Sequence, residues 1–307
     1  MFCGTIKIPL ILYAGIAFFK YAIYLPVKKY FMKKNLSIDE KVQSFYETLP
    51  FNIYGNIDIA TNRIKKISLF KTYPVLKEIF EKNKIDNVID FGCGGGWLIN
   101  SLAFSKNVNV YGVDFSKTAL KYANDISKKL KLKTTLINSN IFDFKIDLKF
   151  DLLISLGALH HTSNCLRALN HICKFGNDKS FIFLGLYHKY GRKPFLDFVK
   201  NLDNRSENEK FEKYKQLHKL TDEKHLYSWF RDQVLHPNET QHTYKEISSE
   251  LSNNGFKIFS TSINNFEPFS SDEEIIKKEK KLYDYGHNKI KNNEYYPGFF
   301  ITVAKNF

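Results

Sequence analysis

The chain has 307 residues, of which 43% are hydrophobic and 25% are charged, and this composition is typical of a folded globular protein. The formal net charge is +14, but 41 of the 46 basic residues are lysines, and they are spread along the whole chain. Because bidentate binding of phosphates and bases is mainly the work of arginine, this pattern argues against a nucleic-acid-binding surface.

The first 34 residues are apolar and basic, and they contain no acid. The run "IPLILYAGIAFF" covers residues 8–19, and Lys20 follows it. A membrane-spanning helix needs about 20 apolar residues, a length reached here only with Lys20 inside. Three alternatives therefore stay open for residues 1–34: a spanning helix, a helix in the membrane interface, and a helix packed on the domain. The positive charges are Lys7, Lys20, Lys28, Lys29, Lys33 and Lys34.

The compartment follows from the same segment and from the cysteines. No small-x-small cleavage site follows the apolar run, which argues against a cleaved signal peptide. The lysines predict that residues 35–307 form a cytoplasmic domain, attached to the inner face of the membrane if residues 1–34 bind lipid. The cysteines form no C-x-x-C pair, which is typical of a reduced, intracellular protein. They are Cys3, Cys93, Cys165 and Cys173.

From residue 73 onward, predicted helices and strands alternate. The hydrophobic pattern predicts helices at 73–83, 96–106, 117–131 and 164–175, and strands at 87–91, 108–114, 133–138, 150–156 and 180–187. Residues 243–263 then predict a helix, a stop at Gly255 and a sixth strand, and residues 299–304 predict the last one. This order predicts an α/β fold with a doubly wound, seven-stranded, mostly parallel sheet. The charged segment 188–240 is expected to be a helical insertion, or lid, between strands five and six, where insertions commonly cover a ligand.

A glycine-rich turn follows the first predicted strand, in "NVIDFGCGGGWLIN" at residues 87–100. Four glycines surround Cys93, but Trp97 stands where the dinucleotide-binding pattern G-x-G-x-x-G has its last glycine. Asp90 directly precedes the turn, and its carboxylate would repel a pyrophosphate and attract a cationic amino-acid group. The turn therefore favours a ligand other than a dinucleotide.

The following strand ends supply the rest of a binding site. Asp114 ends the second strand, where an acid can accept hydrogen bonds from both hydroxyls of a ribose. Asn140 and its neighbours follow the third strand and can frame an adenine. A ligand with an amino acid at one end and an adenosine at the other is S-adenosylmethionine (SAM). The predicted SAM-binding residues are Asp90, Gly92, Cys93, Gly94, Gly96, Asp114, Phe115, Asn140, Ile141, Ser155 and Gly157.

The motifs "VIDFGCGGG", "GVDFS" and "FDLLISLGALHH" resemble the successive motifs of class I SAM-dependent methyltransferases. From about residue 43 to the end, the chain is similar to one bacterial branch of this superfamily, mostly without an assigned substrate. The matching words are "FYETLPF", "GALHHTSN", "GLYHKYGR", "WFRDQVLHPNETQHT", "FEPFS" and "PGFFITVAK". His188 departs from this pattern, because asparagine is expected after "GLY". Residues 1–34 lie outside the resemblance.

Two segments contain candidate catalytic groups. Histidines 160 and 161 follow the fourth strand, and either could serve as a base near neutral pH or simply pack the start of a helix. The segment "WFRDQVLHPNETQHT", residues 229–243, is either a polar lid that binds the acceptor or a hydrogen-bonded corner that holds the insertion. A metal site is disfavoured there because Pro237 interrupts a continuous helix. The candidate catalytic residues are His161, Asp232, His236, Glu239 and His242, and the candidate substrate-binding residues are Tyr187, Arg192 and Gln233.

These features predict methyl transfer from SAM to a small-molecule or lipid-like acceptor. Two aromatic residues of "FYETLPFNIY", Tyr46 and Phe51, are expected to form an N-terminal lid over the cofactor. One alternative is a non-catalytic protein that binds SAM. A nucleic-acid methyltransferase is the other, disfavoured because "LGALHH" replaces the base-flipping motif expected after strand four.

Overall fold

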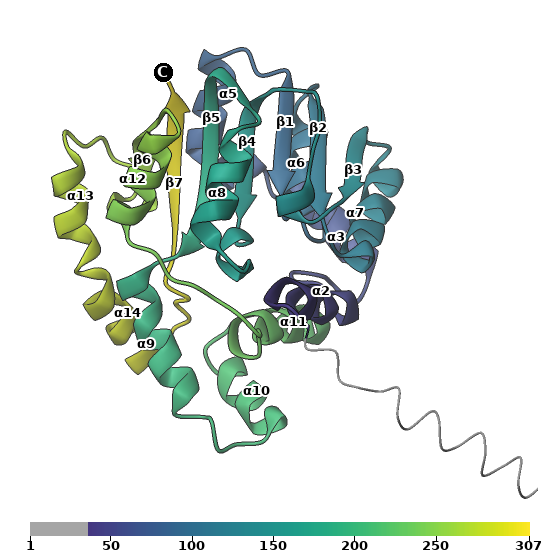
Figure 1. Cartoon of the computed structure of the whole chain (residues 1–307). Coiled ribbons are helices and arrows are strands. Elements are labelled where there is room, and N and C mark those ends of the chain that lie inside the picture. The colour runs from purple at the N-terminus through teal and green to yellow at the C-terminus, as the bar shows by residue number, and fades with distance from the viewer. Residues whose placement is uncertain (1–35) are drawn as a thin grey trace, which may run out of the picture. The chain divides into compact units, whose positions relative to one another are not determined.

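The computed structural model describes residues 36–307, and residues 38–307 form one compact unit (Figure 1). The expected N-terminal helix and Cys3 lie outside the described residues. Among residues 36–307, no helix combines the length and the apolar character that crossing a membrane requires.

One seven-stranded sheet forms the centre of the unit, with strand order β3-β2-β1-β4-β5-β7-β6. Strands β1 to β5 pair in parallel, whereas β7 runs antiparallel between β5 and β6 (Figure 1). The mostly parallel sheet expected from the sequence is therefore confirmed. The strands are β1 (Asn87–Phe91), β2 (Asn109–Asp114), β3 (Thr134–Asn138), β4 (Phe150–Leu156), β5 (Gly176–Tyr187), β6 (Phe256–Thr261) and β7 (Phe299–Asn306).

The helices flank and cap this sheet. They are α2 (Ile38–Thr48), α3 (Ile57–Lys66), α4 (Leu69–Thr72), α5 (Pro74–Lys82), α6 (Trp97–Ser105), α7 (Lys117–Leu130), α8 (Cys165–Cys173), α9 (Lys189–Lys200), α10 (Glu207–Lys215), α11 (Glu223–Val234), α12 (Tyr244–Asn253), α13 (Asp272–Glu279) and α14 (Leu282–Lys291). Short 3-10 turns lie at Ile141–Asp143, Leu159–His161 and Ser262–Asn264.

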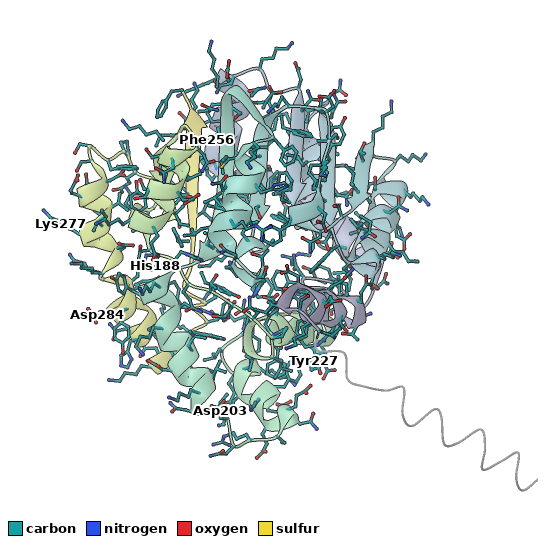
Figure 2. All side chains as sticks on the ribbon, viewed as in Figure 1. His188, Asp203, Tyr227, Phe256, Lys277 and Asp284 are labelled. Carbon is teal, nitrogen blue, oxygen red and sulfur yellow. The ribbon has the colours of Figure 1, made fainter. Side chains whose placement is uncertain are left out.

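Alternating residues of the strands bury two separate hydrophobic layers, as expected for a parallel sheet with two covered faces. On one face, Ile89 and Phe91 pack with Leu169 of α8 and Ile247 of α12. On the other face, Val88 packs with residues of α4, α5 and α6. Charged side chains such as Asp203, Lys277 and Asp284 lie at the rim of the molecule, whereas Phe256 is in the interior (Figure 2).

Helices α9, α10 and α11 occupy the segment between β5 and the last two strands. Together with α14 they surround a small hydrophobic cluster of their own, centred on Phe195, Tyr214 and Phe230. In Figure 1 these helices lie beyond the carboxyl ends of the parallel strands. They therefore cover the edge of the sheet at which doubly wound folds bind their ligands.

The start of α9 is organised by His188, the residue that departs from the bacterial pattern. Its Nδ1 accepts a hydrogen bond from the Gly191 N–H, and its Nε2 donates to the carboxylate of Glu279 at 2.8 Å. Both side chains are almost fully buried. His188 thus combines an N-cap, which asparagine could also supply, with a tie to α13.

Candidate active site

A pocket opens at the carboxyl ends of β1, β2 and β4, beneath α2 and α11. The space between its atoms measures about 770 Å³, including the part open to solvent. Its lining combines the glycine turn, strand ends and residues of α2: Asp39, Val42, Tyr46, Pro50, Phe51, Gly92, Gly94, Asp114, Phe115, Ala119, Ser139, Asn140, Ile141, Leu156, Gly157, Ala158, His161, Thr162 and Asp232.

The glycine turn brings bare backbone to this pocket. Gly92 has a φ of +76°, and a Cβ built on it would stand 2.2 Å from the Cβ of Ala158. Only glycine therefore lets the loops after β1 and β4 approach so closely. Gly94 has a φ of +51°, and its N–H donates a 2.8 Å hydrogen bond to Oδ2 of Asp114. The turn is thus oriented by the acid at the end of the adjacent strand.

Two buried acids stand beside the turn. Asp90 is 4% exposed, and its Oδ1 is a buried atom with no hydrogen-bond partner in the described chain. Burial, together with the charge of Asp114, raises the pKa of Asp90 to about 8. Burial also raises the pKa of Asp114 to about 6, although hydrogen bonds from the Ser116 and Gly94 amides oppose the shift. Among residues 36–307 no cation pairs with either carboxyl, so the site suits a positively charged ligand group.

Polar and apolar groups after β2 and β3 continue the pocket. Phe115, Asn140 and Ile141, three of the predicted cofactor residues, line it. The side chain of Asn140 accepts a hydrogen bond from the Phe142 N–H at 2.9 Å, which fixes the turn that follows β3. An aromatic ring and an aliphatic side chain are therefore held close to Asp114, an arrangement that suits a flat heterocycle.

Asp90 does not itself line the pocket, and neither do three further predicted cofactor residues. The Cys93 side chain belongs to the core and faces Gly112 of β2. Gly96 caps α6 and allows close packing against Ala123 of α7. Ser155 is fully buried and donates its hydroxyl to the Phe91 carbonyl, which links β4 to β1. Their positions are explained by packing of the fold.

Helix α2 forms one wall of the pocket, a role that the strand pattern did not reveal. Asp39, Val42 and Tyr46 follow helical spacing and line the pocket together. Glu47 fastens the helix by accepting hydrogen bonds from the Lys117 N–H and the Thr118 hydroxyl at the start of α7. The predicted N-terminal lid residues Tyr46 and Phe51 do lie at the pocket.

A cluster of polar rings joins α2 to α11 and to the loop after β4. The Tyr46 hydroxyl donates a 2.5 Å hydrogen bond to Oδ1 of Asp232, and His161 Nε2 lies 3.8 Å from the same oxygen. His161 Nδ1 donates to the Asn238 carbonyl at 2.9 Å, and its ring centroid lies 3.7 Å from that of His236. His161 and Asp232, one from each candidate catalytic segment, therefore meet at the pocket.

His236 supports this cluster from behind. Its Nδ1 accepts a hydrogen bond from the Asn238 N–H at 3.1 Å, and the pocket lining does not include it. Burial and the nearby His161 lower the pKa of His236 to about 2. The ring is therefore neutral near pH 7 and is a poor candidate for the base.

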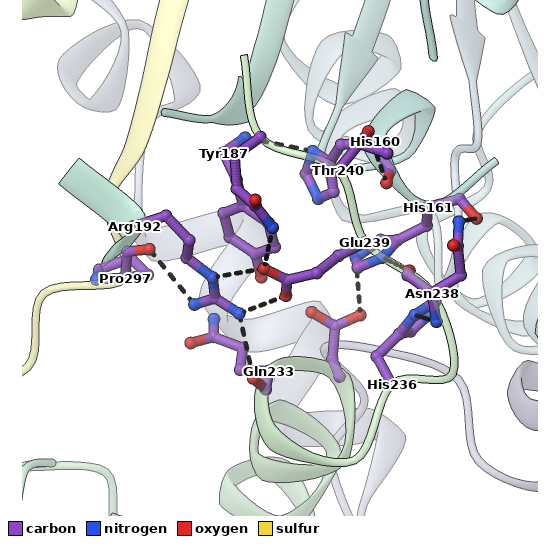
Figure 3. A network of polar contacts seen from close by, with 12 residues as sticks. His160, His161, Tyr187, Arg192, Gln233, His236, Asn238, Glu239, Thr240 and Pro297 are labelled. Carbon is purple, nitrogen blue, oxygen red and sulfur yellow. Dashed lines mark hydrogen bonds and ion pairs between the residues drawn. The ribbon is translucent and has the colours of Figure 1, made fainter. Parts of the chain in front are cut away.

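The remaining candidates form a buried network next to the pocket, not in its lining (Figure 3). Arg192 is fully buried and binds Glu239 through two hydrogen bonds, of 3.0 and 2.6 Å. It also donates to the Gln233 carbonyl at 3.0 Å, and its guanidinium lies 3.8 Å from the ring centroid of Tyr187. These contacts connect β5, α9 and α11. They agree with the interpretation of residues 229–243 as a hydrogen-bonded corner that holds the insertion.

His242 belongs to the same corner. Its backbone N–H donates to the Tyr187 carbonyl at 2.9 Å, and its Nε2 lies 2.9 Å from the Thr240 hydroxyl. It does not line the pocket. Within residues 36–307, no group of three or more His, Cys, Asp or Glu side chains could hold a metal ion.

Comparison with protein families gives one match: the profile of a family described as "Methyltransferase domain" matches residues 82–298. No curated protein matches the chain.

Solved structures share the fold. Magnesium protoporphyrin IX methyltransferase (ChlM) from Synechocystis PCC 6803, with bound SAM, is 15% identical, and the match covers 90% of this chain and 100% of that one with a TM-score of 0.52. PKMT2 from Rickettsia typhi is 18% identical, with 76% of this chain and 52% of that chain covered and a TM-score of 0.55. At these sequence identities, the similarity shows a shared fold and nothing further.

Proposed function

The chain belongs to the family described as "Methyltransferase domain", and from this premise we propose that it transfers a methyl group from SAM to a small-molecule or lipid-like acceptor. One observation carries the choice of donor. Asp90 has a buried oxygen without a partner in the described chain, beside a glycine turn and on the same side of the sheet as Asp114. A cationic amino-acid group favours the ionised form of Asp90, and a ribose joined to it can donate its hydroxyls to Asp114.

The described residues fit each part of this donor. Asp90 would hold the ammonium group, and the backbone of Gly92 and Gly94 would let the amino-acid end approach. Each oxygen of Asp114 accepts one backbone N–H and has a further lone pair for a ribose hydroxyl. Asn140 and Ile141 would frame the adenine. When bound, SAM supplies an electrophilic methyl group on its sulfonium sulfur.

The acceptor side is formed by His161, Asp232 and Tyr46. In the neutral ring of His161, Nδ1 carries the proton because it donates to the Asn238 carbonyl. Its Nε2 is therefore a hydrogen-bond acceptor, and it is a buried atom without a partner in the described chain. This nitrogen can take a proton from an acceptor bound in the pocket. Helices α2 and α11 hold the acceptor and exclude water, which supports transfer by positioning.

Two observations support a small-molecule acceptor: the pocket and the fold neighbour. A concave pocket lined mainly by apolar side chains and backbone suits a small molecule. The neighbour ChlM is a methyltransferase of magnesium protoporphyrin IX, which supports a small-molecule acceptor here. The helices α9 to α11 would act as the lid over this site.

We also propose that the enzyme is cytoplasmic and that residues 1–34 attach it to the inner face of a membrane. The support is the composition of that segment, which combines an apolar run with six lysines and no acid. A lipid-like acceptor would explain the attachment.

The test combines donor binding with transfer. The pure protein is incubated with SAM labelled on its methyl group and with an extract of its own cells, and we expect label to enter a small molecule. The Asp114→Ala variant should bind SAM at least about tenfold more weakly by calorimetry. Asp125→Ala, which removes a surface acid paired with Lys121 on α7, is the matched control. Unchanged binding in Asp114→Ala, or binding without any labelled product, would contradict the proposal.

A further inference from the structure

We propose that the group methylated in this pocket is a primary amine, bound between Asp232 and His161. This inference rests on the proposed function and specifies the acceptor atom.

The first argument is geometric. His161 Nε2 and Asp232 Oδ1 are 3.8 Å apart, which is too long for a hydrogen bond between them. Both atoms are acceptors when His161 is neutral, because the carbonyl of Asn238 holds the ring proton on Nδ1. One ligand atom that satisfies both must therefore donate two hydrogen bonds. A primary amine or its ammonium form does so, a hydroxyl group donates one, and a carboxylate donates none.

The second argument concerns charge. Asp232 is 5% exposed, and in the described chain its carboxylate has one hydrogen-bond donor, Tyr46. The nearby arginines are engaged elsewhere: Arg192 pairs with Glu239, and Arg231 donates to the carbonyls of Phe45 and Leu49. While His161 is neutral, Asp232 has no ion-pair partner among residues 36–307. An unpaired buried carboxylate is costly, so a cationic ligand is favoured at this position.

The charged residues that line the pocket also favour a positively charged acceptor. Its lining contains Asp39, Asp114 and Asp232, and no lysine or arginine from the described part of the chain. Burial also raises the pKa of Asp232, although His161 and Tyr46 oppose the shift. A carboxylate acceptor would find no cation to pair with and would be repelled. Val42, Pro50 and Phe51 offer contact to an apolar body attached to the amine.

The transfer balances with these groups. The ammonium form R–NH3⁺ gives one proton to His161 Nε2, and the nitrogen thereby regains its lone pair. That lone pair forms the N–CH3 bond as the S–CH3 bond breaks, and the electron pair of the broken bond stays on sulfur. The product R–NH2⁺–CH3 keeps its charge beside Asp232. The proton on His161 then passes to solvent.

The experiment compares three probes of one shape: 2-phenylethylamine, 2-phenylethanol and phenylacetate. Each is titrated by calorimetry into the protein saturated with S-adenosylhomocysteine, so that no reaction occurs. We expect the amine to bind at least about tenfold more tightly than the alcohol, and phenylacetate to bind most weakly. In Asp232→Asn the preference for the amine should fall to within about threefold. Asp222→Asn removes a charge at the N-cap of the same helix, where asparagine caps equally well, and should keep the preference.

The outcomes separate the two proposals. If S-adenosylhomocysteine itself does not bind, the proposed function fails. If it binds and the alcohol or the carboxylate binds as tightly as the amine, or if no probe binds, the amine proposal alone is overturned. Thermal unfolding of Asp232→Asn, with and without S-adenosylhomocysteine, shows whether the variant is folded. A preference for the amine that persists in folded Asp232→Asn also overturns the proposal.

Discussion

Asp90 and Asp114 point to the same face of the sheet from two adjacent parallel strands. Asp90 of β1 pairs with Gly112 of β2, and Asp114 lies two residues beyond Gly112 on the same strand. Two buried carboxyls therefore lie near one end of the pocket, whose lining includes Asp114, and the charge of Asp114 disfavours ionisation of Asp90. A cationic ligand group beside Asp90 would favour the ionised form of this carboxyl. Donor binding should therefore be accompanied by release of its proton.

Binding of SAM at pH 7 should release close to one proton, mainly from Asp90. The pKa of Asp90 is raised to about 8 by burial and by Asp114, so this carboxyl is mostly protonated at pH 7 in the free protein. An ammonium group beside it favours the carboxylate and lowers its pKa, so affinity should rise with pH between about 6 and 8. Calorimetry at one pH in phosphate and in Tris measures the released proton. A binding enthalpy that is the same in both buffers contradicts this assignment, and Asp90→Asn should abolish the difference.

Asp90→Asn should make the free protein more stable above about pH 6. Because the folded-state pKa of Asp90 lies above its ordinary value, the folded protein binds this proton more tightly than the unfolded chain does. Its contribution to stability is complete below the ordinary pKa and is lost as pH rises toward 8. Asparagine at position 90 cannot ionise, so the variant does not lose stability in this way as pH rises. Urea unfolding of both proteins at pH 5 and pH 8 should show a stability difference that grows with pH, and a constant difference would contradict the prediction.

The donor half of the site could be predicted because its parts are close in the sequence. The turn after β1 and the ends of β2 and β3 lie within residues 87–141, and parallel strands bring their carboxyl ends to one edge. The strands at 87–91 and 150–156 were predicted with the observed bounds. The prediction placed three residues at the cofactor that lie in the core instead: Cys93, Gly96 and Ser155. Strand alternation and packing decide this, and the position of a residue in a motif does not reveal it.

The acceptor half depends on contacts between distant segments. Tyr46 meets Asp232 across 186 residues, and Glu47 reaches Thr118 across 71. No local period predicts such pairs, because the partners lie on segments far apart in the sequence. The helices α13 and α14 were also not predicted. α13 is short and highly charged, and it buries little besides Ile275 and Glu279.

His161 and His236 should differ sharply in their effect on methyl transfer. His161→Phe keeps a flat ring against His236 but removes Nε2 from the pocket, so transfer should fall by about 10²-fold or more while SAM affinity is unchanged. His236→Phe keeps the ring contact and removes a nitrogen that is already bonded to the Asn238 N–H. Its transfer rate should stay within about threefold of the wild type, because the pKa of His236, about 2, leaves it neutral. Labelled transfer into cell extract measures both, and equal losses would reject His161 as the base.

Glu239→Gln should act on stability. Glu239 is the ion-pair partner of the fully buried Arg192, and removing one member of such a pair leaves the other uncompensated. We expect a loss of about 3–5 kcal/mol in the free energy of unfolding, measured in urea. The double variant Arg192→Met/Glu239→Met should recover part of this loss, because it removes both charges. If Glu239→Gln unfolds like the wild type but loses methyl transfer, the carboxylate has a chemical role after all.

Deleting residues 1–34 should release the protein from membranes without changing SAM affinity. Six lysines near an anionic surface each contribute about 1 kcal/mol, and the apolar run adds hydrophobic binding. Sedimentation with vesicles containing 30% phosphatidylserine compares the full chain with the truncated one. Replacing Lys28, Lys29, Lys33 and Lys34 by glutamine is the charge control, and it should weaken binding and its salt dependence while the apolar run is kept. A full chain that stays in the supernatant at low salt would rule out the tether. Because the pocket is built from residues 39–232, SAM binding by the truncated protein would show that attachment and chemistry are separate.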